Sequence, residues 1–149
     1  MISKDFKEFI QLLNASKVKY LVVGGYALAV YGYPRYTKDL DVWIWIDQEN
    51  AGKMVQILNE FGFGSLNLKE GYFLEEGYVI QLGQPPNRID ILNSLSGVEF
   101  QQCYPRRKLE NIDGLLINFI GLECYKKNKK ATGRIQDLAD LEKLESLHE

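Results

Sequence analysis

Residues 22–46, VVGGYALAVYGYPRYTKDLDVWIWI, place two glycines at the end of one apolar run and two aspartates inside a second apolar run. The first run is predicted to be a buried strand and residues 26–31 a short helix, so the order is strand, glycine turn, helix. Residues 39–46 form a second predicted strand, in which alternate side chains share a face. One face therefore carries both aspartates and two tryptophans that we expect to cover the core: Asp39, Asp41, Trp43 and Trp45.

The remaining chain alternates between helical and strand patterns. YVIQLGQPPNRIDIL and RRKLENIDGLLINFI are each predicted to be two strands joined by a turn. This order predicts an α/β (α+β) fold, with a small mixed β-sheet flanked by helices and with further helices at the C-terminus. Apart from residues 26–31, helical spacing of apolar residues predicts helices at about 6–14, 50–61, 121–130 and 134–147.

Composition limits the classes of protein to which the chain can belong. Its 149 residues are 46% hydrophobic and 26% charged, which is ordinary for a globular protein with one core. The formal net charge of -2 excludes a chain that is basic throughout. Any contact with a nucleotide or a nucleic acid must therefore come from a local basic patch, and one such patch lies near the C-terminus.

The cysteines and the N-terminal residues indicate the cellular compartment in which the protein works. Cys103 and Cys124 lie far apart without CxxC spacing, so we expect two small core residues in a reducing environment rather than a zinc site or a structural disulfide. Charged residues between positions 4 and 8 interrupt any apolar leader, and no apolar run approaches ~18 residues. We therefore expect a cytoplasmic protein with no membrane contact.

The aspartates in the apolar strands indicate metal chemistry. Asp39 and Asp41 lie ~6.5–7 Å apart at Cα, close enough to converge on divalent cations, and without a cation their repulsion raises a pKa. Asp90, in a later apolar strand, would complete a cluster of hard oxygen ligands suited to two Mg²⁺ or Mn²⁺ ions. Such a cluster serves phosphoryl or nucleotidyl transfer. The alternative for Asp90 alone is an ion pair with Arg88 across the strand end.

The glycines suggest where a phosphate would bind. Gly24 and Gly25 lie where a strand gives way to a helix, so the backbone can approach a phosphate and direct helical N–H groups at it. A pair of glycines before a helix is also typical of a plain tight turn. The combination of glycines, Asp-x-Asp and a later Asp is more specific than any one of its parts.

Together these motifs resemble the nucleotidyltransferases of the DNA polymerase beta superfamily, in particular the minimal bacterial and archaeal members and the abortive-infection toxin-type branch. The resemblance runs from about residue 6 to the end of the chain. It implies one nucleotidyltransferase-like domain over 1–149, with a catalytic core at about 18–95 and a C-terminal hairpin and helices at about 96–149. It also implies that Gly24 and Gly25 hold the triphosphate, and that Asp39 and Asp41 bind metal. Asp90 is then the third carboxylate, as a metal ligand or as the base for the acceptor hydroxyl.

Two further segments look like the toxin-type branch. YPRYTKDLDVWI places Arg35 and Thr37 ahead of the acids, and the resemblance implies nucleotide contacts for both. In the tail NKKATGRIQDLADLEKL, Lys129 and Arg134 are implied to neutralise the triphosphate. The acids of this tail, Asp137 and Asp140, are expected to pair with these cations or to hold the last helix.

The leading hypothesis is the transfer of a nucleoside monophosphate from an NTP to a hydroxyl of a protein, a transfer RNA or other RNA, or a small molecule. A second hypothesis is a non-catalytic relative that binds a nucleotide, RNA or a partner protein, as one component of a toxin–antitoxin pair. Gly25 motivates this second hypothesis, because many active members have serine there. A third is a phosphotransferase that moves the γ-phosphate with a similar metal site.

Overall fold

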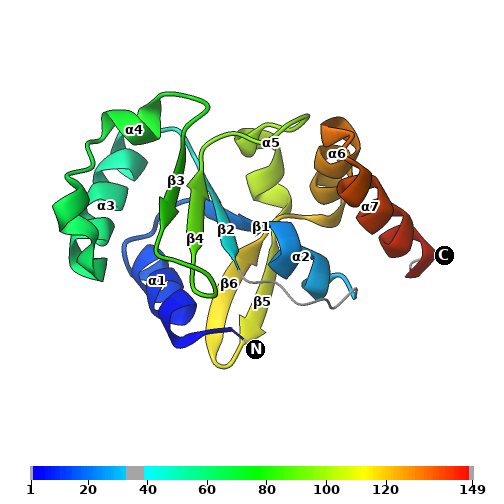
Figure 1. The fold of residues 1–149 in the computed structure, drawn as a ribbon, viewed down its shortest axis with the longest axis horizontal. Helices are drawn as coiled ribbons and strands as arrows, with labels where there is room; N and C mark the ends of the chain where they lie inside the picture. The colour runs from blue at the N-terminus through cyan, green and yellow to red at the C-terminus, as the bar shows by residue number, and fades with distance from the viewer. Residues whose placement is uncertain (1, 33–38, 148–149) are drawn as a thin grey trace.

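A six-stranded mixed sheet forms the centre of the protein, in the strand order β3-β4-β2-β1-β6-β5 (Figure 1). The computed structural model describes residues 2–32 and 39–147. β1 is antiparallel to β2 and parallel to β6, and β2 is parallel to β4. The predicted mixed sheet is therefore confirmed. The strands are β1 (Tyr20–Val23), β2 (Leu40–Ile44), β3 (Val79–Leu82), β4 (Ile89–Leu92), β5 (Lys108–Ile112) and β6 (Leu115–Phe119).

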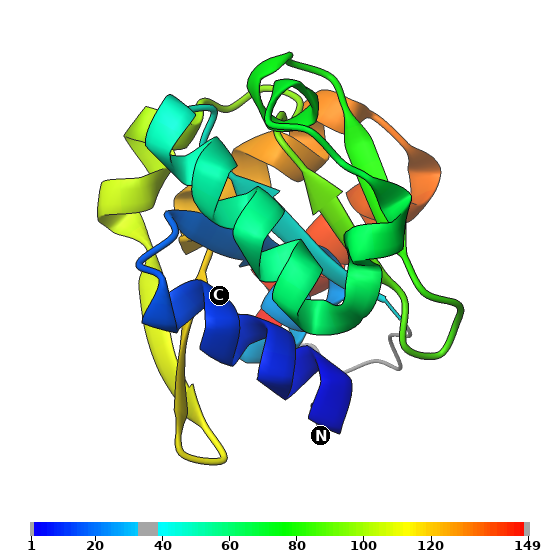
Figure 2. The same ribbon diagram turned by 90° about the vertical axis from the view of Figure 1, so that its left-hand side faces the viewer.

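Helices cover both faces of this sheet. α1 and α3 lie on one face, and α6 and α7 lie on the other, as the two views of the ribbon show (Figures 1 and 2). No helix in the described part of the chain is long and apolar enough to cross a membrane. The helices are α1 (Lys4–Ala15), α2 (Gly24–Val30), α3 (Gln48–Leu58), α4 (Gly71–Leu74), α5 (Phe100–Cys103), α6 (Leu122–Thr132) and α7 (Ile135–Leu147).

The long elements follow the predictions closely. α1 buries the four apolar residues that recur at helical spacing, and the Ser3 hydroxyl caps its N-terminus by accepting a hydrogen bond from the N–H of Phe6. The β5–β6 hairpin turns at Asp113 and Gly114, which have φ angles of 53° and 84°. The short helices α4 and α5 were not predicted, because four residues are too few to show a helical period.

Trp43 of β2 and Trp45, which follows directly after this strand, cover the core, as expected. Trp43 is 1% exposed, and its ring meets that of Phe100 edge to face with 5.2 Å between centroids. Trp45 is half-buried, and the Lys19 ammonium lies 4.6 Å from its ring centroid. Both aromatic side chains are therefore packed against other parts of the protein.

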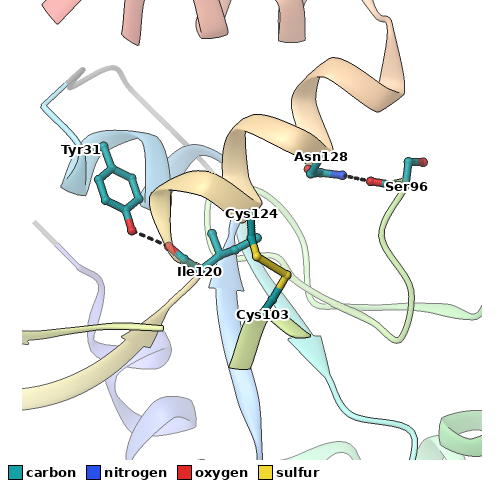
Figure 3. Close-up of a disulfide and its surroundings, with 6 residues drawn as sticks. All are labelled: Tyr31, Ser96, Cys103, Ile120, Cys124 and Asn128. Carbon is teal, nitrogen blue, oxygen red and sulfur yellow. Dashed lines mark hydrogen bonds between the residues drawn. A yellow bond between two sulfur atoms is a disulfide. The ribbon is translucent and has the colours of Figure 1, made fainter. Parts of the chain in front are cut away.

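The prediction that the cysteines would not form a structural disulfide is wrong. Cys103, the last residue of α5, is disulfide-bonded to Cys124 in the first turn of α6, with 6.0 Å between their Cα atoms (Figure 3). Sequence spacing alone does not reveal this pairing, because the unpredicted helix α5 brings Cys103 to α6. The disulfide fixes the start of α6 against α5, in the segment between β4 and β5.

Two hydrogen bonds fix α6 and its approach further, and Figure 3 shows both. The Tyr31 hydroxyl donates to the carbonyl of Ile120 just before α6, over 2.6 Å. Along the helix, the Asn128 amide donates to the carbonyl of Ser96 over 3.0 Å, and Asn128 is 5% exposed. The approach to α6 is therefore held by the residue that caps α2, and α6 itself by the loop that follows β4.

Candidate functional site

The predicted aspartates meet at one edge of the sheet. β2 and β4 are parallel, and their register places Asp41 directly opposite Asp90. On its other side Asp41 is opposite Val23 of the antiparallel β1, which ends at this edge and leads into Gly24. Asp39 directly precedes β2. Two strand starts and one strand end therefore bring the three acids and the first glycine together.

Gly24 lies against the carboxylate of Asp41. Its φ is 69°, a region that L side chains rarely adopt, and a Cβ built on it would collide with Oδ2 of Asp41. Both the left-handed backbone conformation of residue 24 and the lack of room for a Cβ beside Asp41 therefore require glycine at this position. Gly25 follows in the first turn of α2 and is half-buried.

A pocket of ≈ 540 Å³ opens beside this edge. Its wall joins the end of β1 and the start of β2 to the end of β4, the loop after it and the C-terminal half of α6. Four residues predicted for the site share this wall, although Asp39, Asp90 and Gly25 are not among those that line it. The lining residues are Val23, Gly24, Asp41, Leu92, Ser94, Leu95, Ser96, Asn128, Lys129, Thr132 and Arg134.

Arg88 ion-pairs with two of the three aspartates. Its Nη2 donates to Oδ2 of Asp39 over 2.8 Å and to Oδ2 of Asp90 over 3.1 Å. Its Nε also lies 3.0 Å from Oδ1 of Asp90. The hydrogen bond to Asp90 and the charges of the acids raise the pKa of Arg88. The ion pair considered for Asp90 is therefore present, and the same guanidinium also holds Asp39.

Asp41 has a different environment from the other two acids. Burial, together with the nearby charges of Asp90 and Asp39, raises its pKa from 3.8 to about 7, and Lys129 opposes this shift. Within residues 2–32 and 39–147, no arginine or lysine nitrogen lies within 4.0 Å of its carboxylate. Among the described residues, ionised Asp41 therefore lacks an ion-pair partner beside two other carboxylates, and a bound cation would favour its charged form.

The donor atoms and the charge at Asp41 fit a hard divalent cation such as Mg²⁺ or Mn²⁺, which prefers carboxylate oxygens. Across the described residues, however, no three acidic, histidine or cysteine side chains gather as a ready metal site. Asp39 and Asp90 are instead held by Arg88. The carboxylates thus have the right chemistry, but two of them are already paired.

The basic residues of the tail are held by Asp137. Its Oδ2 accepts hydrogen bonds from the Thr132 hydroxyl and from Nε of Arg134, each over 2.7 Å, and its Oδ1 lies 3.4 Å from Nζ of Lys129. Burial alone would raise the pKa of Asp137, but Thr132, Lys129 and Arg134 lower it below its usual value. The expected pairing is confirmed for Asp137, while Asp140 accepts a hydrogen bond from Gln136.

Other residues of the site were not predicted, and two predicted ones cannot be placed. Arg35 and Thr37 lie outside the described residues. The pocket lining also includes Asn128 and the stretch 94–96, which were not predicted. For 94–96 a sequence signal was available, because loops shortly after a buried strand often carry binding residues. Asn128 gave no such signal, since its sequence context is that of an ordinary polar residue in a helix.

Comparison with solved structures finds this fold in nucleotidyltransferase-like proteins. An antigenic protein of this kind from Paracoccidioides brasiliensis has 17% identity over 95% of this chain and 73% of that one, with a TM-score of 0.58. A candidate nucleotidyltransferase from Thermotoga maritima has 17% identity over 99% of this chain and 93% of its own, with a TM-score of 0.57. The lincosamide antibiotic adenylyltransferase LnuA, with lincomycin bound, has 18% identity over 98% of both chains, with a TM-score of 0.62. No protein-family model and no curated protein matches the sequence.

These similarities agree with the architecture described above. The protein has a mixed α+β fold of the nucleotidyltransferase type. At such identities the likeness establishes the fold alone, and function must be argued from the site.

Proposed function

We propose that this protein is a metal-dependent nucleotidyltransferase, which moves a nucleoside monophosphate from an NTP to a hydroxyl of a protein, RNA or small-molecule acceptor. The observation that carries the proposal is the register of Asp41 with Asp90 at the sheet edge where β1 ends at Gly24. Fold similarity to nucleotidyltransferase-like proteins supports it. The toxin-type branch is part of the proposal and rests on the tail NKKATGRIQDLADLEKL.

The pocket supplies what a triphosphate needs. Its volume of ≈ 540 Å³ lies within the range of ~300–1,000 Å³ that is usual for ligand sites. Lys129 and Arg134 line it and would neutralise phosphate charge, with Asp137 holding both in place. Gly24, which lines the pocket, and Gly25, which follows it, leave backbone free of side chains where the triphosphate would approach. Arg35 and Thr37 are proposed as further nucleotide contacts.

Asp39 and Asp41, joined by Asp90, would hold two Mg²⁺ or Mn²⁺ ions. When bound, such ions would supply charge stabilisation for both the attacking and the leaving oxygen. The chain's own contribution is to keep Asp41 rigid, because Asp41 lies within β2 and is flanked by β1 and β4. A carboxylate on a strand between two others is held more precisely than one on a loop.

The proposed reaction is a displacement at the α-phosphorus. The acceptor hydroxyl oxygen forms a bond to the α-phosphorus, the bond from that phosphorus to the α–β bridging oxygen breaks, and pyrophosphate leaves. The hydroxyl proton passes to a carboxylate, and Asp90 is the group proposed for this step if it is not a metal ligand. Gly25 provides no hydroxyl for the phosphates, so the backbone and the cations of the tail carry that role.

A labelling experiment tests this function. The purified protein is incubated with Mg²⁺ or Mn²⁺, cell extract and each NTP, labelled in turn at the α- or the γ-phosphate. Hydroxyl-bearing antibiotics are added as one class of small acceptor, because LnuA, which has the same fold, is a lincosamide adenylyltransferase. Retention of the α-label on protein, RNA or a small molecule is the expected result. Label from the γ-phosphate alone would instead establish a phosphotransferase, and no label with tight nucleotide binding would establish a binding protein.

A further inference from the structure

The backbone of Arg88 joins the start of β4 to the start of β2, close to the three aspartates. It directly precedes β4, and its carbonyl accepts a hydrogen bond from the N–H of Leu40 at the start of β2, over 3.0 Å. Strand periodicity places its side chain on the same face as that of Asp90. The guanidinium is therefore directed at the acids by the sheet itself.

One nitrogen of Arg88 joins two carboxylates. Nη2 reaches Oδ2 of Asp39 and Oδ2 of Asp90 at 2.8 and 3.1 Å, while Nε faces the other oxygen of Asp90 at 3.0 Å. Nη2 thus makes charge-assisted hydrogen bonds to both carboxylates, whereas the contact between Nε and Oδ1 of Asp90 is an ion pair without a hydrogen bond. A divalent ion that bridges Asp39 and Asp90 needs oxygens that Arg88 already engages.

The charges of the site are compensated unevenly within residues 2–32 and 39–147. Arg88 compensates Asp39 and Asp90, whereas Asp41 has no arginine or lysine nitrogen within 4.0 Å among the described residues. Among the described residues the three carboxylates have one guanidinium paired with them, and Lys129 acts on Asp41 from farther away, so the cluster can still attract a divalent ion while Arg88 stays in place. The side chain of Arg88 is 28% exposed, so it can leave toward solvent while its backbone stays bound to Leu40.

We propose that Arg88 is a tethered counter-ion that competes with a divalent cation for Asp39 and Asp90. In the metal-free protein it takes the place of a bridging ion, and full loading of the carboxylates requires its guanidinium to leave them. Arg88 is a positioning residue in this account, because it acts through the aspartates. The inference rests on the proposed function only in taking these aspartates as metal ligands.

Calorimetric titration of Mn²⁺ into the nucleotide-free protein tests this competition. Arg88→Met keeps much of the side-chain length but removes the charge and the donors, and we expect it to bind Mn²⁺ at least tenfold more tightly than the wild type. Arg106→Met is the matched control, because Arg106 is exposed and makes none of the contacts to these aspartates. An unchanged or weaker affinity in Arg88→Met would overturn the proposal.

A second control separates direct competition from the general effect of removing a positive charge. Lys129 acts on Asp41 through its charge but makes no ion pair with Asp39 or Asp90. We expect Lys129→Met to tighten Mn²⁺ binding clearly less than Arg88→Met does. Equal tightening in the two variants would show that Arg88 acts only through its charge, and would overturn competition for the carboxylate oxygens.

The wild-type protein provides a test that does not depend on how the variants fold. The Nε–H of Arg88 is followed by NMR while diamagnetic Mg²⁺ is added. We expect its resonance to shift and its exchange with water to accelerate as the guanidinium leaves Asp90. A signal that stays unchanged at saturating Mg²⁺ would overturn the proposal.

These measurements contain neither an NTP nor an acceptor, so they separate the inference from the proposed function. Competition at Arg88 with no label transfer would refute the enzymatic proposal and leave this inference intact. Label transfer with unchanged Mn²⁺ affinity in Arg88→Met would support the enzymatic proposal and refute the inference on Arg88.

Discussion

The carboxylate of Asp41 occupies the space that a side chain at Gly24 would need. The two residues lie 17 positions apart in the sequence, yet a Cβ on Gly24 would collide with Oδ2 of Asp41. Any side chain at this glycine would therefore displace the acid that lies between β1 and β4. This contact ties the end of β1 to the proposed metal site.

Gly24→Ala should lower both stability and nucleotide binding. The left-handed φ of 69° costs alanine about 1–2 kcal/mol of unfolding free energy, and the collision adds a displacement of Asp41. Gly114→Ala is the matched control, because Gly114 has a φ of 84° with nothing near its Cβ position. Urea unfolding should show a loss in both variants, whereas NTP binding should weaken only in Gly24→Ala. Normal binding in Gly24→Ala would contradict this role.

The raised pKa of Asp41 predicts how stability depends on pH in the metal-free protein. Folding raises this pKa from 3.8 to about 7, so the folded state holds the proton more tightly, and the stability that this group contributes is lost as pH rises through about 7. Asp41→Asn removes the effect. In EDTA at about pH 8, we expect Asp41→Asn to melt at a higher temperature than the wild type, and the difference to shrink toward about pH 5. A wild type that melts higher at both values would refute the assignment.

The cations of α6 should differ in their effect on triphosphate binding. Lys129 lines the pocket, so Lys129→Gln should weaken NTP binding by about tenfold or more, the loss expected for one charge-assisted contact. Lys130→Gln is the control, since Lys130 is the next residue of the same helix and is exposed. Equal effects in the two variants, measured by calorimetry, would mean that only the overall charge of the helix matters.

The disulfide should stabilise the fold by constraining the unfolded chain. Cys103 and Cys124 are separated by 21 positions, and a loop of this length predicts about 3 kcal/mol of unfolding free energy in the oxidised protein. Thermal melting with and without a thiol reductant measures the effect. A double variant with Ala at both positions should not respond to the reductant, and an equal response in that variant would exclude the disulfide as the cause.

The part of the fold nearest the site could be predicted because its signals are local. Apolar runs and strand alternation are sufficient to predict β1, α2 and β2, and to place Asp39 and Asp41 on one face. The pairing of Asp41 with Asp90 is different in kind. It depends on the register of two strands far apart in the chain, which no local pattern determines.

The rest of the site required tertiary structure. Asn128 reaches the pocket because α6 is held by Ser96 and by the disulfide, and neither contact leaves a sequence signal. Periodicity places Arg88 on the face of Asp90, but its reach to Asp39 depends on how β2 and β4 pair. The roles of Lys129 and Arg134 were suggested by family resemblance rather than by physical pattern.

The most direct measurement of the central claim compares transfer of α-labelled NTP by the wild type and by Asp41→Asn, with Mn²⁺ and cell extract present. Asp113→Asn serves as the matched control, because this residue lies in the β5–β6 turn with a φ of 53° that asparagine also tolerates. The account predicts label transfer by the wild type and by Asp113→Asn, and none by a folded Asp41→Asn. Equal transfer by all three proteins, or by none of them, would contradict it.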